Sequence, residues 1–172
     1  VVTISEVGLD FMPGTLAQSS QEDAFRAQIR LARQADLPII FHSRNSHQEV
    51  LRVIREEHAG DVGGAWHYFQ DDLAQALQAI ELVFYVSLAK PLLRLPELQD
   101  LARSLPLNRI VLETDSAPQP WKKYRRNWTE PSHVRQVAEK LAQIKELAIE
   151  EVIQLTTNNL LEILNLSEDI VD

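Results

Sequence analysis

The amino-acid sequence predicts an α/β fold of the TIM type, a (β/α)8 barrel of which this chain supplies strands 4 to 8 as a partial barrel. Two observations lead to this prediction. Short apolar runs alternate with longer segments of helical periodicity. In addition, a polar side chain follows each apolar run at a nearly regular interval. The alternation predicts a parallel sheet, and the recurring polar residues favour a closed barrel over an open sheet.

Five apolar runs are the predicted strands, because they are too short for helices and rich in β-branched and aliphatic residues. They are residues 1–4, 38–41, 62–66, 83–86 and 110–112. The third run is the weakest, since Gly63 and Gly64 interrupt it. We expect strands of this kind to be buried on both faces.

Segments of helical periodicity separate the predicted strands and follow the last one. They cover residues 22–34, 47–58, 73–80, 97–104, 131–145 and 150–164. In the first of them, Phe25, Ile29 and Ala32 form one apolar stripe. The chain contains no long linker and no repeat, and its one long loop covers residues 117–129. The sequence therefore predicts a single domain over residues 1–172.

A polar residue follows each apolar run, one to three residues beyond its end. These residues are Glu6, His42, His67, Ser87 and Asp115, with separations of 36, 25, 20 and 28 residues. The mean, about 27, is the length of one βα unit, and in a barrel the strand ends converge on one mouth that holds the chemistry. Eight such units need more than roughly 200 residues. We therefore expect three units to precede Val1, where the chain opens directly on a strand.

The composition excludes several classes of protein. The chain has no cysteine, so a disulfide framework, a thiolate metal site and a cysteine nucleophile are excluded, and any metal must be bound by His, Asp and Glu. No apolar stretch approaches the roughly 18 residues that span a bilayer, and the first residues lack the basic-then-apolar layout of a signal peptide, so we expect no membrane partner. The absence of cysteine also leads us to expect a cytoplasmic protein. The net charge of −8 leaves room for a local basic patch.

Four of the polar residues form a mixed carboxylate and imidazole set of the kind that binds Zn, Mn or Mg. A single His after a strand is more often structural than a ligand. Four ligand-type residues at successive strand ends, however, rarely arise by chance. Carboxylates gathered at one mouth also repel one another unless a cation neutralises them. The predicted metal ligands are Glu6, His42, His67 and Asp115.

Two further features suit a substrate that contains phosphate. Arg44 follows His42 by two residues and is expected over the same mouth, where it either binds a phosphate bidentately or caps a loop. Residues 122–128 interleave four cations with two aromatic rings, which suits either a nucleic-acid backbone with stacked bases or an ordinary solvated loop. Glu113, next to Asp115, is expected to point away from the mouth or to lie behind the ligands.

Residues 5–11 (Ser-Glu-Val-Gly-Leu-Asp-Phe), 38–44 (Pro-Ile-Ile-Phe-His-Ser-Arg) and 112–116 (Leu-Glu-Thr-Asp-Ser) are three motifs in this order. With the helical segment that carries Gln21 and Phe25, they resemble the TatD family of metal-dependent deoxyribonucleases and related hydrolases. The likeness extends over nearly the whole chain.

The resemblance implies a hydrolase that cleaves phosphodiester bonds, most often of DNA, with two divalent metal ions and a water molecule. It implies that Glu6 bridges the two metals and that His42 and His67 ligate one of them. It also implies that Asp115 contributes to the other metal and transfers the proton of the water molecule. Glu6 and Asp115 are therefore the implied catalytic residues. Arg44 is the candidate substrate-binding residue.

The chain also departs from the family pattern. The His-x-His strand that completes the first metal site is absent, and His67 is followed by Tyr-Phe where the family usually has Cys-Phe. We therefore expect one metal site built from Glu6, His42 and His67, and a weaker one from Glu6 and Asp115. Two alternatives remain open: a small-molecule amidohydrolase-like activity, and a non-catalytic partial barrel.

Overall fold

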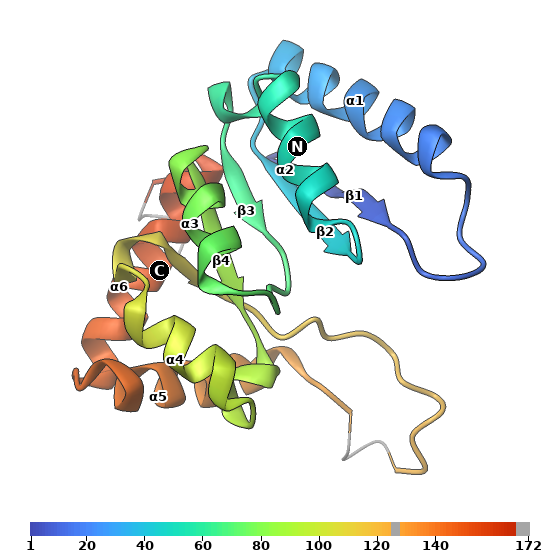
Figure 1. Cartoon of the computed structure of the whole chain (residues 1–172). Helices are drawn as coiled ribbons and strands as arrows, with labels where there is room; N and C mark the ends of the chain where they lie inside the picture. The colour runs from blue at the N-terminus through green and yellow to red at the C-terminus, as the bar shows by residue number, and fades with distance from the viewer. Residues whose placement is uncertain (125–127, 168–172) are drawn as a thin grey trace.

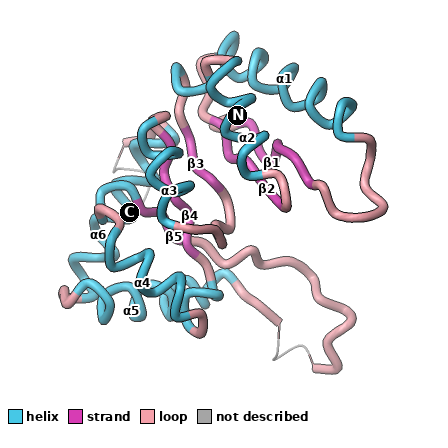
Figure 2. Tube along the Cα trace, in the orientation of Figure 1, coloured by secondary structure: helices cyan, strands magenta, loops and turns pink. Residues whose placement is uncertain are grey.

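The structure, a computed structural model, describes residues 1–124 and 128–167. Within these residues the strands form one parallel sheet in the order β1-β2-β3-β4-β5 (Figures 1 and 2). The strands are β1 (Ile4–Asp10), β2 (Ile39–Arg44), β3 (Gly64–Trp66), β4 (Phe84–Leu88) and β5 (Ile110–Leu112). The predicted α/β class and the five parallel strands are confirmed. The partial barrel of strands 4 to 8 and the single domain stay predictions.

Helices follow every strand, as the sequence predicts. They are α1 (Gln18–Ala35), α2 (His47–Glu56), α3 (Leu73–Glu81), α4 (Pro96–Ser104), α5 (Val134–Lys145) and α6 (Ile149–Leu164), with the 3₁₀ turns η1 (Ala59–Asp61), η2 (Lys90–Leu93), η3 (Leu107–Arg109) and η5 (Pro131–His133). Residues 113–124, which follow β5, leave the sheet and extend toward the lower right of Figure 1. No helix in the described part of the chain is both long and apolar enough to cross a bilayer.

The main core lies between the sheet and the helices. Phe41 of β2 packs against Trp66 and Phe84 of the next two strands, with ring centroids 5.3 and 5.1 Å apart. Phe25 and Ile29 of α1 are fully buried in the same core, which confirms the apolar stripe expected for this helix. This layer of aromatic rings fixes the middle of the sheet.

The opposite face of the sheet carries a smaller apolar cluster. Ala65, Tyr85 and Val111 of three adjacent strands pack there with Ile163 of α6. Side chains alternate between the two faces of a strand, so residues two positions further along lie on the same face. At the carboxyl ends of β2 to β5 these residues are His42, His67, Ser87 and Glu113.

The first strand differs from the prediction. β1 begins at Ile4, where backbone pairing with β2 starts opposite Ile39, and it continues to Asp10. Glu6 therefore lies within the strand and does not follow it. Only Val7 and Leu9 of β1 are buried, so the expectation of burial on both faces is wrong for this strand. Of the other residues, Ser5 and Glu6 are exposed, and Ile4, Gly8 and Asp10 are partly buried.

Gly8 is the point at which β1 lies closest to His42. Its φ is +135°, and a Cβ at this position would collide with the His42 carbonyl oxygen. Residue 8 must therefore be glycine. This close approach brings the Glu6 segment of β1 beside the histidine of β2, with Gly8 directly opposite His42 in the register.

Candidate active site

His67 is the centre of the site and directly follows β3, as predicted. Its backbone N–H donates to the carbonyl oxygen of Phe41 at 2.8 Å, which extends the pairing of β3 with β2 by one residue. The side chain is only 13% exposed, and it lies between two carboxylates. Nδ1 is 2.8 Å from Oε2 of Glu113, and Nε2 is 2.7 Å from Oε1 of Glu6.

Glu113 is held firmly behind His67. Its Oε1 accepts hydrogen bonds from the Ser87 hydroxyl at 2.6 Å and from the Tyr68 backbone N–H at 2.7 Å. Burial alone would raise the pKa of Glu113, but the hydrogen bonds from His67, Ser87 and Tyr68 lower it. Of the two positions considered for Glu113, the structure shows the one behind a predicted ligand. A carboxylate fixed in this way orients the imidazole that it contacts.

The pKa values of the two histidines of the site are shifted in opposite directions. Burial lowers the pKa of His42, and the charge of Glu6 offsets this only in part. Burial also opposes the charged form of His67, but the hydrogen bond to Glu113 and the charges of Glu113, Glu6 and Asp115 raise its pKa. The two ring centroids are 6.5 Å apart. The site therefore pairs an imidazole whose neutral form is favoured by burial with one whose charged form is favoured by neighbouring carboxylates.

Asp115 and Arg44 lie at the rim of the site. Asp115 is exposed, three residues beyond β5, with a φ of +49°. Its charge contributes to the raised pKa of His67 and, after burial, to that of Tyr68. The Arg44 side chain is 59% exposed, with Nη1 3.7 Å from Oδ2 of Asp10. Arg44, His42 and Tyr68 line one small cavity of about 200 Å³.

The oxygen and nitrogen atoms at the strand ends are of the chemical types that bind a divalent cation. Over residues 1–124 and 128–167, no three His, Asp or Glu side chains already stand in an arrangement that could hold a metal ion. Glu6 and His67 nevertheless present an oxygen and a nitrogen side by side, and His42 adds a second imidazole. A histidine backed by a carboxylate, as His67 is by Glu113, is the usual arrangement around a metal-bound imidazole.

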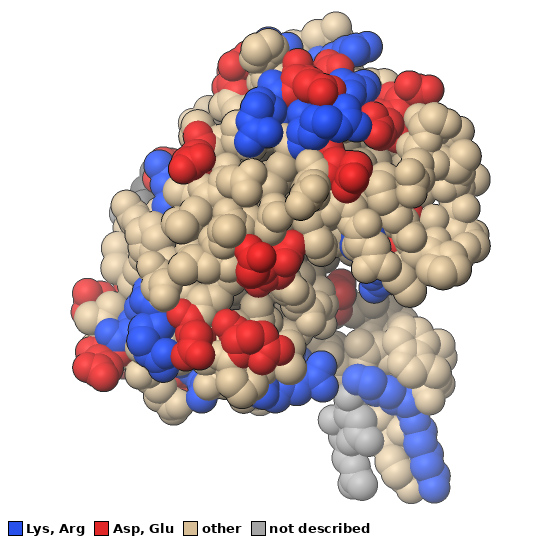
Figure 3. All heavy atoms as spheres, viewed as in Figure 1, with Lys and Arg blue, Asp and Glu red and all other residues tan. Residues whose placement is uncertain are grey.

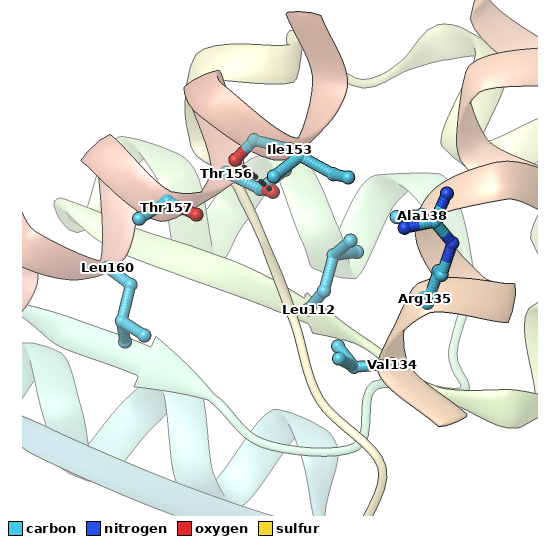
Figure 4. Close-up of a pocket in the computed structure, with 8 residues that line it drawn as sticks. All are labelled: Leu112, Val134, Arg135, Ala138, Ile153, Thr156, Thr157 and Leu160. Carbon is cyan, nitrogen blue, oxygen red and sulfur yellow. Dashed lines mark hydrogen bonds between the residues drawn. The ribbon is translucent and has the colours of Figure 1, made fainter. Parts of the chain in front are cut away.

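A separate apolar pocket of about 390 Å³ lies between β5, α5 and α6 (Figure 4). The described residues that line it are Leu112, Val134, Arg135, Ala138, Ile153, Thr156, Thr157 and Leu160. One hydroxyl there is already used, because Thr156 Oγ1 donates to the Val152 carbonyl at 2.8 Å. The described lining contains no imidazole or carboxylate, so this pocket offers none of the predicted types of metal ligand.

Sequence analysis missed two cations near the site. Lys90 and Arg94 follow β4 and line a cavity that also contains Lys122 from the predicted basic loop. Their position soon after the fourth apolar run is the feature of the sequence that could have indicated them. Within the basic loop itself, residues 125–127 lie outside the described part of the chain.

The fold and the site together define an α/β protein with a candidate metal centre at the carboxyl ends of parallel strands. Residues 1–165 match the model of the family described as TatD related DNase. The chain belongs to the TatD family, which confirms the resemblance. That it represents the carboxyl-terminal part of the family barrel stays a prediction.

Among curated proteins, the chain is 35% identical over 164 residues to the "uncharacterized metal-dependent hydrolase YabD" of Bacillus subtilis, covering 92% of this chain and 63% of the relative. It is 34% identical over 167 residues to the human "deoxyribonuclease TATDN3", covering 95% of this chain and 60% of the relative. The chain thus spans about three fifths of the length of these relatives.

Among solved structures, the TatD homologue YJJV of Escherichia coli superimposes with a TM-score of 0.87 at 25% identity, over 97% of this chain and 65% of that one. A TatD family hydrolase of Entamoeba histolytica gives 0.83 at 22% identity, over 95% and 63% of the two chains. The second similarity concerns the fold alone. Together they support the TIM-type class that the sequence predicts.

Proposed function

We propose that this chain carries the site of a divalent-metal-dependent hydrolase that cleaves phosphodiester bonds, with DNA as the substrate. The observation that carries the proposal is His67, held between Glu113 and Glu6 at the strand ends. The names of the relatives support it, because one is a metal-dependent hydrolase and another a deoxyribonuclease. TIM-type enzymes also keep their catalytic residues at these strand ends.

Glu6, His42 and His67 would hold one metal ion, and Glu6 with Asp115 a second, weaker one. Zn, Mn and Mg all suit this set of donors. When bound, a divalent metal lowers the pKa of a water molecule and neutralises charge on phosphoryl oxygens. Burial favours the neutral form of His42, which is the form with a lone pair to donate. Glu113 holds the His67 ring in one orientation.

Two exposed residues at the rim supply the remaining functions. Arg44 has a largely exposed guanidinium group and is our candidate for binding the non-bridging oxygens of the phosphodiester. Asp115 is exposed to solvent, so its carboxylate can accept a proton from the attacking water. These roles divide the site into metal ligands, a phosphate-binding residue and a proton acceptor.

The test combines calorimetric titration with Zn or Mn and cleavage of a labelled oligodeoxynucleotide. We expect about one site per chain, because three ligands with open positions hold a divalent ion better than two carboxylates do. Asp115→Asn should keep this site and lose about 100-fold or more in cleavage rate. Two equally tight sites, no binding, or full cleavage by Asp115→Asn would each contradict the proposal.

A further inference from the structure

Two cavities open beside the candidate metal centre, and Tyr68 lines both of them. The first, of about 200 Å³, contains Arg44. The second, of about 400 Å³, is lined by Lys90, Arg94 and Lys122. Tyr68 is the residue that the two linings share. One aromatic side chain therefore lines both cavities, and each cavity contains at least one cationic side chain.

The second cavity is basic although the chain as a whole carries a net charge of −8. Lys90 and Arg94 come from the η2 turn after β4, and Lys122 comes from the segment after β5. The described lining of neither cavity includes Asp or Glu. Cations that converge from separate segments on one cavity attract a ligand with several negative charges.

Tyr68 is fixed relative to the metal centre. It directly follows His67, and its backbone N–H donates to Glu113 at 2.7 Å. The Tyr68 and His67 ring centroids are 5.9 Å apart. The ring is partly buried. An aromatic ring held in place is a surface on which a base can stack.

We propose that the two cavities bind phosphates of one single-stranded nucleic acid on either side of the cleaved bond, and that Tyr68 stacks against a base between them. The position of the cleaved bond rests on the proposed function, whereas the binding itself does not require hydrolysis. A single strand repeats a phosphate and an exposed base along its length, which matches two cationic cavities that share an aromatic ring in their linings. In a duplex the bases are stacked on one another and offer no free face.

The test is fluorescence anisotropy of a labelled single-stranded DNA about 12 nucleotides long, without added metal, so that binding is measured apart from cleavage. Lys90→Gln and Arg94→Gln address the basic cavity, and Tyr68→Leu removes the ring but keeps an apolar side chain. Arg103→Gln is the matched control, because Arg103 is an exposed cation of α4 paired with Asp100. Circular dichroism confirms that each variant folds.

We expect Tyr68→Leu to weaken binding by about 5- to 100-fold. The double variant Lys90→Gln with Arg94→Gln should reduce the slope of log affinity against log salt by about 1.4, the value for two phosphate contacts on a single strand. Arg103→Gln should bind normally. The same losses of affinity for RNA of equal length would support recognition of phosphate and base whichever sugar the strand contains.

The proposal is overturned if the strand does not bind, if the cavity variants bind as well as Arg103→Gln, or if Tyr68→Leu has no effect. It is also overturned if a DNA duplex or polyglutamate binds as tightly as the single strand, because either result would show a surface for any polyanion. Binding with the expected losses but no metal-dependent cleavage would uphold this inference and refute the proposed function alone.

Discussion

Two clusters of charged residues differ in their ratio of negative to positive groups. One is the set of ion pairs between α1 and the α2 segment, and the other lies at the strand ends. Between the helices, Glu57 is only 10% exposed and contacts two guanidinium groups, with Arg26 Nη1 at 2.9 Å and Arg30 Nε at 2.7 Å. Figure 3 shows acidic and basic side chains intermixed over these helices. Arg26 also pairs with Glu56, so two carboxylates contact two guanidinium groups, and this balanced cluster stabilises the packing of α1 on the α2 segment.

At the strand ends the balance is uneven. His67 contacts Glu6 and Glu113, and the charge of Asp115 acts on it as well. One imidazole cannot offset three carboxylates, and an excess of negative charge in a confined site favours a bound cation. The balanced cluster is therefore expected to affect the free energy of unfolding, and the unbalanced one the affinity for a metal.

The largest expected effect is on metal binding when His67 is removed. His67→Ala takes away a predicted ligand and the group that separates Glu6 from Glu113, so the affinity for Zn should fall by more than about 100-fold. Isothermal titration calorimetry measures this. His58→Asn is the control, since His58 is exposed with a φ of +52°, which Asn tolerates. Unchanged affinity in His67→Ala would remove His67 from the site.

Glu113→Gln should weaken Zn binding by a smaller factor, about 10- to 100-fold. Glutamine keeps the size of the side chain but removes the charge that orients His67. Glu139→Gln changes an exposed α5 residue that pairs with Arg135, and this variant should bind Zn as the parent chain does. Equal affinities for the two variants would show that His67 is positioned without help from Glu113.

Much of the fold can be predicted because its signals are local. A buried strand requires a short apolar run, and a helix on the sheet requires a stripe such as that of Phe25 and Ile29. The position of His67 after β3 follows from the same reasoning. The extent of β1 cannot be predicted from its own residues, because it is set by pairing with β2 from Ile4 to Asp10.

The interactions within the site are harder to predict for the same reason. Glu113 lies behind His67 because Ser87 and the backbone of Tyr68, from other segments, donate to it. The basic cavity forms only where segments after β4 and β5 meet. Sequence spacing brings polar residues to the correct edge of the sheet, but the contacts between them depend on how neighbouring strands are aligned.

A substitution in the balanced cluster should lower the free energy of unfolding and leave the affinity for metal unchanged. Glu57→Gln leaves Arg26 and Arg30 without the carboxylate that both contact, so the free energy of unfolding should fall by about 1–3 kcal/mol. Glu139→Gln, which removes an exposed pair, should change it by less than about 0.5 kcal/mol. Urea denaturation measures both. A Glu57→Gln variant with reduced Zn affinity would contradict the separation of the two clusters.

The smallest expected effect is the pH dependence of the difference in unfolding free energy between the parent chain and Glu57→Gln. The hydrogen bond from Arg30 lowers the pKa of Glu57 from 4.5 to about 2, with burial opposing and Arg26 adding to the shift. Because the pKa is lower in the folded chain, ionised Glu57 stabilises the fold fully above pH 4.5, and this stabilisation is lost as the pH falls toward 2. The stability gap between the parent chain and Glu57→Gln should therefore narrow over this range in urea titrations. A gap that stays constant down to pH 2 would show that the variant is destabilised by altered packing and not by the loss of charge.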